Sequence, residues 1–229
     1  MTLAIAHRGD PVGRRENTLE AFESARSLGA GMVELDCKLT RDGHVVVLHD
    51  DTLRRLWGVP RPVRAIDWKE VSAIRKGGYR IPDLAEVLAE VPLPIMVDVP
   101  SIEVLEASLA VVEAARAVDR CVFAGHTGAL VRLRQRSRSA RIALSWEKRQ
   151  LPGPELLDAV RPDWFNPSHR RATALVVERM HAAGRGVSVW TVDRPSDIAR
   201  VLHAGVDAVI TNQTARLVAA VGRATEWPV

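Results

Sequence analysis

The sequence has no apolar run long enough to cross a membrane. A membrane-spanning helix needs about 20 consecutive apolar residues, whereas the apolar run at the N-terminus, Leu3 to Ala6, has four. That run is also too short for the apolar region of a secretory signal peptide. With 47% hydrophobic and 26% charged residues, the composition is that of an ordinary soluble globular protein, and we expect no membrane span.

Cysteine is almost absent from the chain. Cys37 and Cys121 are the only two, and neither has a partner at the short spacing typical of a zinc site. Each lies in an apolar run, where a free thiol behaves as a small hydrophobic side chain. We therefore expect two reduced, structural thiols and a cytoplasmic location.

Aromatic residues are also scarce, at 4% of the chain, although the formal net charge is +4. Five arginines crowd between positions 132 and 141, either as a solvated helix face or as a patch that binds RNA. Proteins that bind single strands stack the bases on aromatic side chains, so one Tyr and three Phe favour the solvated face. We expect no nucleic-acid partner, while a mildly basic surface would attract an anionic substrate.

Short apolar runs alternate with amphipathic helical patterns along the whole chain. Strands are predicted at residues 3–6, 32–36, 44–48, 95–99, 121–124, 141–145, 163–166, 187–192 and 207–211. The first helix is predicted to begin at Asn17 as its N-cap, because Glu20 follows three residues later. Further helices are predicted at 84–91, 102–118, 129–135, 154–160, 173–183, 195–204 and 215–222. Residues 51–80 are expected to form an irregular loop with one short helix near 69–73.

Grouping the strand at 44–48 with the second strand gives eight strand–helix units. The strands are apolar and β-branched, as strands buried on both faces must be. This pattern predicts an α/β fold, a single (β/α)8 TIM barrel spanning residues 1–229 as one domain. The alternative is an open doubly wound sheet, but no G-x-G-x-x-G motif follows the first strand, which weakens a dinucleotide-binding interpretation.

Carboxylates lie on the predicted second and third barrel strands, whose carboxyl ends open on one mouth. Glu34 and Asp36 are two residues apart and so share one face of a strand, where two buried carboxylates repel each other. With Asp98 they would form an all-oxygen site suited to Mg²⁺, Ca²⁺ or Mn²⁺. The alternative is that Arg8 or Lys38 neutralises one carboxylate and that no metal binds.

Two histidines end strands beside these carboxylates. His7 and His49 could be metal ligands, buried core histidines or an acid/base pair. Because histidine titrates near neutrality, one of them could accept a proton while the other donates one. Their position next to the carboxylates favours this pair, and His126 and His169 are weaker candidates to line the mouth.

A cation and an indole complete the predicted site. Arg8 follows His7, and its guanidinium could clamp a phosphate with two hydrogen bonds or form a structural ion pair with Glu16 or Asp50. Trp190 could cover an alcohol or sugar-like group of a substrate, or it could fill the barrel. The sequence does not separate these last two interpretations.

The motifs together resemble one known family. They are Ala6-His7-Arg8-Gly9, Glu16-Asn17-Thr18, Glu34-Leu35-Asp36, Thr40-Arg41-Asp42-Gly43, His49-Asp50, Ile81-Pro82-Asp83-Leu84, Val189-Trp190-Thr191-Val192, Gly205-Val206-Asp207 and Ile210-Thr211. This pattern is similar to that of the glycerophosphodiester phosphodiesterases. The resemblance implies a TIM barrel and a divalent metal, Mg²⁺ or Ca²⁺. It also implies hydrolysis of glycerophosphodiesters to an alcohol and sn-glycerol 3-phosphate.

Carried over by position, the resemblance implies metal ligands at Glu34 and Asp36, an acid/base pair at His7 and His49, and a phosphate contact at Arg8. The chain departs from the family pattern at several positions. Asp98 stands where the family has Glu, Pro100 where it has Lys, Ala124-Gly125-His126 where it has Ser-Phe, and Asn212 where it has Asp. Two other functions remain open: a lyase similar to the phospholipase D toxins of spiders, which stops at a cyclic phosphate, and a catalytically weak barrel that binds a phosphorylated ligand.

Overall fold

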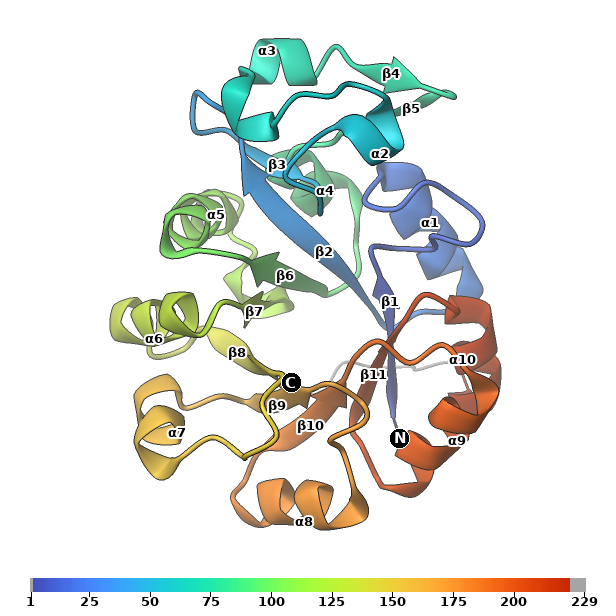
Figure 1. Ribbon diagram of the computed structural model, residues 1–229, viewed down its shortest axis with the longest axis vertical. Coiled ribbons are helices and arrows are strands. Elements are labelled where there is room, and N and C mark those ends of the chain that lie inside the picture. The colour runs from blue at the N-terminus through green and yellow to red at the C-terminus, as the bar shows by residue number, and fades with distance from the viewer. Residues whose placement is uncertain (1, 223–229) are drawn as a thin grey trace.

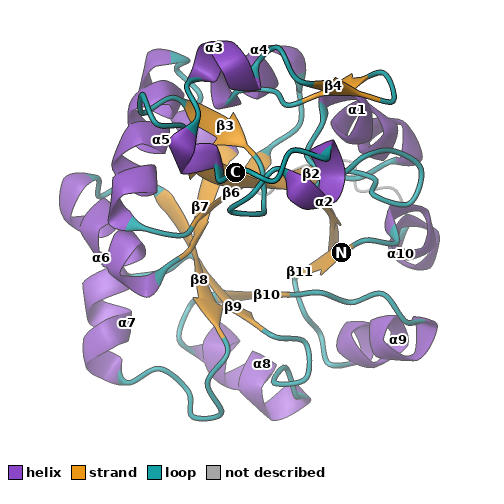
Figure 2. Ribbon diagram, turned by 45° about the horizontal axis from the view of Figure 1, so that its top comes forward, coloured by secondary structure: helices purple, strands orange, loops and turns teal. Residues whose placement is uncertain are grey.

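The computed structural model describes residues 2–222. Eight parallel strands close into a barrel, and Figure 2 shows them as an inner ring with helices around it. They are β1 (Leu3–His7), β2 (Met32–Leu39), β6 (Ile95–Val99), β7 (Cys121–Gly125), β8 (Arg141–Trp146), β9 (Trp164–Pro167), β10 (Gly186–Val189) and β11 (Ala208–Thr211). The ring closes because β1 pairs in parallel with both β11 and β2. The predicted (β/α)8 barrel is therefore confirmed, and the open sheet is excluded.

The barrel helices follow the strands in chain order (Figure 1). They are α1 (Leu19–Leu28), α4 (Leu84–Glu90), α5 (Ile102–Ala114), α6 (Thr127–Arg136), α7 (Pro154–Val160), α8 (Ala174–Ala182), α9 (Pro195–His203) and α10 (Thr214–Val221). Helix α5 is shorter than the predicted 102–118, because Arg116 has a positive φ of 53° and a 3-10 turn, Val118–Arg120, precedes β7. No helix within residues 2–222 combines the length and the apolar character that a membrane span requires.

The segment between the second barrel strand and α4 is more ordered than the sequence predicts. It contains β3 (Val45–Val47), antiparallel to β2, then α2 (Arg54–Trp57), a 3-10 turn (Val63–Ala65), α3 (Trp68–Val71) and the hairpin of β4 (Arg75–Lys76) and β5 (Tyr79–Arg80). Its buried side chains form a separate apolar cluster. The Arg15 guanidinium lies over the rings of Trp57 and Tyr79, at 4.9 and 5.2 Å from their centroids, and so ties this segment to the β1–α1 loop.

The predicted N-cap of α1 is wrong by one residue. Thr18 caps the helix, and its side chain accepts a hydrogen bond from the backbone N–H of Ala21 at 3.3 Å. Asn17 instead has a positive φ of 57°, and its amide nitrogen donates to Oδ2 of Asp36 at 2.8 Å. Asparagine tolerates this left-handed conformation better than most residues, so the side chain is free to brace a carboxylate in the barrel.

Candidate active site

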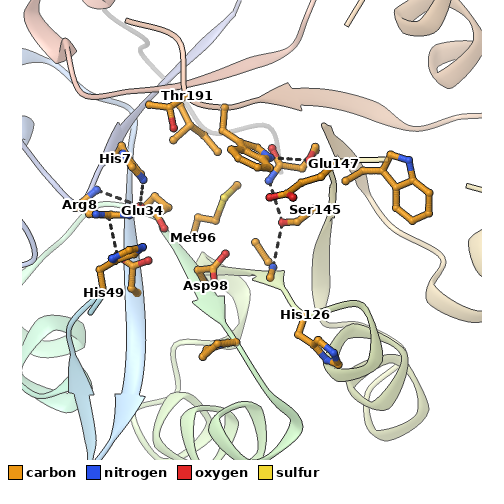
Figure 3. A pocket seen from close by; sticks show the side chains of 18 of the residues that line it. His7, Arg8, Glu34, His49, Met96, Asp98, His126, Ser145, Glu147 and Thr191 are labelled. Atoms are coloured by element: carbon orange, nitrogen blue, oxygen red, sulfur yellow. Dashed lines mark hydrogen bonds and ion pairs between the residues drawn. The ribbon is translucent and has the colours of Figure 1, made fainter. Parts of the chain in front are cut away.

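The carboxyl ends of the strands surround a cavity of about 620 Å³. Figure 3 shows its lining side chains. All seven predicted site residues line it: His7, Arg8, Glu34, Asp36, His49, Asp98 and Trp190. The structure thus brings together side chains from β1, β2, β6, the segment after β3 and the segment after β10, while the role of each remains a prediction.

The ring of His7 is held by a hydrogen bond at the end of the barrel's last strand. Its Nδ1 lies 2.8 Å from Oδ1 of Asn212, and the amide nitrogen of Asn212 donates to Asp193 at 2.9 Å. This second bond fixes the amide oxygen toward His7, so Nδ1 carries the proton and Nε2 keeps the lone pair. Nε2 lies 3.9 Å from Glu34. Burial, followed by the charge of Arg8, lowers the pKa of His7, which favours the neutral ring.

His49 is oriented by its neighbour in the sequence. Its Nδ1 lies 2.8 Å from a carboxylate oxygen of Asp50, which leaves Nε2 without a partner among the described side chains. Hydrogen bonds from Arg55 lower the pKa of Asp50 to about 2, so Asp50 is a carboxylate at neutral pH. His49 is more exposed than His7, and each imidazole therefore presents one nitrogen for proton transfer.

The three carboxylates lie on adjacent barrel strands, with Asp36 of β2 directly opposite Asp98 of β6. Burial and the charges of Asp36 and Asp98 raise the pKa of Glu34 well above its usual value. Burial and the charge of Asp36 raise the pKa of Asp98 to about 7. Ionisation of Glu34 and Asp98 is therefore unfavourable in the protein without a further cation nearby.

A divalent cation fits this donor set chemically. Within residues 2–222 no three metal-binding side chains already converge as a coordination shell, so the carboxylates would have to turn toward one another. Asp36 is paired with Arg8, whereas among the described side chains no Lys or Arg forms an ion pair with Glu34 or Asp98. Carboxylate oxygens are the hard ligands that Mg²⁺ and Ca²⁺ prefer.

Arg8 is committed to carboxylates on two sides. Its Nη1 donates to Glu16 at 3.0 Å, and its Nε lies 3.0 Å from Asp36 without the angle of a hydrogen bond. The ion pair with Glu16 that the sequence suggested is present, whereas Asp50 is reached only through Arg55, which bonds both acids. Arg8 also lines the cavity, so these ion pairs hold it where an anionic substrate would enter.

Of the two cations that the sequence offered to neutralise one of the three carboxylates, Arg8 does form an ion pair with Asp36, whereas Lys38 pairs with none of the three. The Lys38 ammonium lies 2.6 Å from Asp51. His126 lines the cavity, but its Nδ1 accepts from the backbone N–H of Ala129 and caps α6. His169 contacts Arg200 and is not part of the cavity lining.

The wall across the cavity from the two histidines is polar, and apart from Trp190 its residues were not predicted. Asn166 is buried there, donates to Ser145 at 3.4 Å and accepts from Ser188 at 2.9 Å. The indole N–H of Trp190 donates to the backbone oxygen of Asn166 at 2.9 Å. Trp190 therefore both packs in the barrel and lines the cavity. Strand-end position marks Asn212 as a candidate, but no local motif marks Asn166 or Ser145.

Comparisons with known proteins identify the family of this chain. The sequence model of the glycerophosphoryl diester phosphodiesterase family matches residues 7–216. A glycerophosphodiester phosphodiesterase from Caldanaerobacter subterraneus subsp. tengcongensis is 29% identical, over 95% of this chain and 96% of that protein. A Mycobacterium tuberculosis relative is 30% identical, over 92% of this chain and 87% of that protein.

Solved structures show the same fold. A glycerophosphodiester phosphodiesterase from Thermotoga maritima is 26% identical with a TM-score of 0.83, covering 96% of this chain and 98% of that chain. An Oleispira antarctica phosphodiesterase, solved with its product sn-glycerol-3-phosphate, is 23% identical with a TM-score of 0.85, covering 96% and 97%. The chain described here belongs to the glycerophosphoryl diester phosphodiesterase family, and it is a phosphodiesterase.

Proposed function

We propose that this enzyme hydrolyses glycerophosphodiesters to an alcohol and sn-glycerol 3-phosphate. One observation carries the proposal: two histidines, each with one ring nitrogen bonded to a fixed partner and the other available, line one cavity with three carboxylates and Arg8. The names of the relatives support the same substrate class, as does the product bound by the Oleispira antarctica enzyme.

The chemistry proceeds by two proton transfers. His7 takes the proton of the glycerol 2-hydroxyl, because its lowered pKa keeps Nε2 free. The 2-oxygen forms a bond to phosphorus as the bond to the alcohol oxygen breaks, and His49 protonates the departing alkoxide. Water then opens the cyclic phosphate with the two histidines in reversed roles. Arg8 binds a phosphoryl oxygen as negative charge develops on it.

The proposed cofactor is Mg²⁺ or Ca²⁺, held by Glu34, Asp36 and Asp98. When bound, it would withdraw charge from the phosphoryl group and balance the buried carboxylates. We also propose a cytoplasmic location, which the two free, buried thiols of Cys37 and Cys121 support.

One departure from the family pattern favours a second candidate. Pro100 lines the cavity at the position where the resemblance implies a lysine, so one expected cation is missing. A barrel that binds a phosphorylated ligand with little turnover is therefore the alternative. A lyase that stops at the cyclic phosphate would use the same two histidines.

Product analysis separates these functions. Glycerophosphocholine and glycerophosphoglycerol are incubated with enzyme and Mg²⁺ or Ca²⁺, and products are followed by phosphorus NMR. Hydrolysis gives the linear monoester, whereas a lyase accumulates the cyclic phosphate. Release of sn-glycerol 3-phosphate is abolished in His7→Ala and His49→Ala. Calorimetric binding of the diesters without turnover would replace hydrolysis by the binding function, and full activity in both variants would overturn the catalytic roles.

A further inference from the structure

The positive charge of this protein is concentrated at the mouth end of the barrel. The connections that follow the carboxyl ends of the eight barrel strands are residues 8–18, 40–83, 100–101, 126, 147–153, 168–173, 190–194 and 212–213. They contain 17 Lys and Arg against 10 Asp and Glu, a net charge of +7, whereas the whole chain has +4. The remaining residues, which include the three carboxylates of the site, therefore have a net charge of −3. The positive end of the molecule is the end at which the cavity opens.

Many of the cations in these connections have no counter-charge in the protein. Some are ion-paired, as Arg55 is with Glu16 and Asp50. Five exposed arginines have no carboxylate partner among residues 2–222, namely Arg14, Arg54, Arg149, Arg170 and Arg171. Their guanidinium groups are therefore available to an external anion. Because they belong to four different connections, they suit an extended anionic surface better than one small anion.

The exposed apolar side chains lie at the same end of the barrel. Within residues 2–222 three large apolar side chains are exposed, Val12, Ile102 and Leu175, at 67%, 47% and 55%. Val12 lies in the connection after β1, while Ile102 and Leu175 lie in the first turns of α5 and α8, next to strand carboxyl ends. Helical side chains tilt toward the helix N-terminus, so Ile102 and Leu175 extend toward the mouth. Single exposed apolar side chains scattered over a surface need no explanation, but these three share one end.

The arrangement of these side chains indicates the kind of partner. Figure 1 shows α1, α5 and α8 at separate places around the barrel, so Val12, Ile102 and Leu175 do not form the contiguous apolar core of a protein interface. None of the three is aromatic, whereas single-stranded nucleic acids bind on aromatic stacking platforms. Apolar side chains spread around a cationic rim match a flat anionic surface with an apolar interior, which is a lipid bilayer.

We propose that the mouth end of the barrel docks on an anionic lipid bilayer. The three exposed apolar side chains enter the headgroup layer, and the five unpaired arginines contact lipid phosphates. Docking in this orientation turns the opening of the cavity toward the lipid surface. The proposal does not rest on the proposed function. It agrees with the proposed location, because the cytoplasmic leaflet of a membrane carries anionic lipids.

Sedimentation with vesicles tests the contribution of charge. Vesicles of phosphatidylcholine alone are compared with vesicles of equal parts phosphatidylcholine and phosphatidylglycerol at physiological ionic strength. The wild-type protein binds the anionic vesicles and not the neutral ones. Arg171→Gln weakens this binding about fivefold, the factor that corresponds to ~1 kcal/mol for one cation near an anionic surface. The control is Arg179→Gln, at an exposed arginine in the last turn of α8, and it changes binding by less than twofold.

A fluorophore on α8 tests whether the apolar side chains enter the bilayer. An environment-sensitive thiol dye is attached to Leu175→Cys in the first turn of α8, or to Ala183→Cys at its C-cap, as the matched control. Wild-type protein treated with the dye corrects for any labelling of Cys37 and Cys121, which are buried. Anionic vesicles shift the emission of the dye at position 175 to the blue and leave that of the dye at position 183 unchanged.

Three results would overturn the docking surface. They are equal binding to neutral and anionic vesicles, undiminished binding in Arg171→Gln, and equal emission shifts at positions 175 and 183. A duplex DNA oligonucleotide is the competitor. If it binds more tightly than anionic vesicles and no blue shift occurs at position 175, the cationic end serves nucleic acid, which also overturns the proposal. None of these measurements requires turnover, so an enzyme that fails to hydrolyse every diester still decides them.

Discussion

The Nδ1 atom of His7 and the side-chain oxygen of Asn212 lie 2.8 Å apart. Asn212 is itself held by Asp193, which accepts from its backbone N–H at 2.8 Å and from its side-chain amide at 2.9 Å. The proton of the imidazole is thereby placed on Nδ1, and the basic nitrogen is turned toward Glu34. In the proposed mechanism Asn212 is a positioning residue that acts through His7.

Removal of that acceptor is expected to slow the reaction without changing the cavity's charge. Asn212→Ala lowers kcat roughly tenfold, which corresponds to about one net hydrogen bond. Asn212→Asp restores the acceptor and adds a negative charge, which raises the pKa of His7. Because the base must be neutral, the acid limb of the pH profile of kcat moves to higher pH in Asn212→Asp. A wild-type rate and profile in both variants would contradict the role of Asn212.

The Asp50–Arg55 pair predicts a pH-dependent contribution to stability. The pKa of Asp50 is lowered to about 2 by Arg55, against about 3.9 in an unfolded chain. A lowered carboxyl pKa stabilises the fold above the unfolded value, and this stability is lost as the pH falls toward 2. Asp50→Asn therefore unfolds at lower urea concentration than wild type at pH 7. The difference between the two urea midpoints narrows between pH 4 and 2.

Asp158→Asn is the control for this titration, since Asp158 is exposed on α7. Its unfolding midpoint stays within experimental error of wild type at each pH. A gap between wild type and Asp50→Asn that keeps its size down to pH 2 would refute the electrostatic origin of the effect.

Replacement of Glu34 is expected to stabilise the protein without metal and to weaken the stabilisation that added metal provides. The raised pKa of Glu34 means that its ionised form destabilises the metal-free fold at neutral pH. Glu34→Gln therefore melts above wild type in EDTA. Addition of Mg²⁺ or Ca²⁺ at about 100 times Kd stabilises wild type by about 2.7 kcal/mol, and Glu34→Gln by much less. Parallel melting curves with and without metal would exclude Glu34 as a ligand.

The two thiols are expected to be inert in the folded protein. Burial raises the pKa of Cys121 to about 12 and raises that of Cys37 further, so neither forms thiolate near pH 8. A chromogenic disulfide reagent at pH 8 should therefore label neither thiol in the native state and both in urea. Rapid native labelling of either cysteine would show that its surroundings open readily.

The sequence predicts the barrel well because each strand is a short apolar run between amphipathic helices. The sequence also indicates that Glu34 and Asp36 lie together, since a spacing of two residues places both on one face of a strand. The N-cap of α1 is harder to predict from the sequence. Asn17 is a residue type that often caps helices, and Glu20 follows at the expected spacing, yet the backbone of Asn17 is left-handed. Only the tertiary contact with Asp36 explains that choice.

Contacts between distant segments could not be predicted. Asp193 and Asn212 each follow a strand end, and no local pattern pairs them. Such relationships depend on barrel closure rather than on local propensity.

Barrel closure also governs the order in which a newly made or refolding chain can become active. Strand β1 needs β11 on one side, and His7 meets Asn212 across 205 positions of sequence. A contact of such separation forms against a large loop-closure entropy, and topologies rich in such contacts fold slowly. Helical signal should therefore return before catalytic activity during refolding, and the recovery of activity reports the moment at which the first and last strands join.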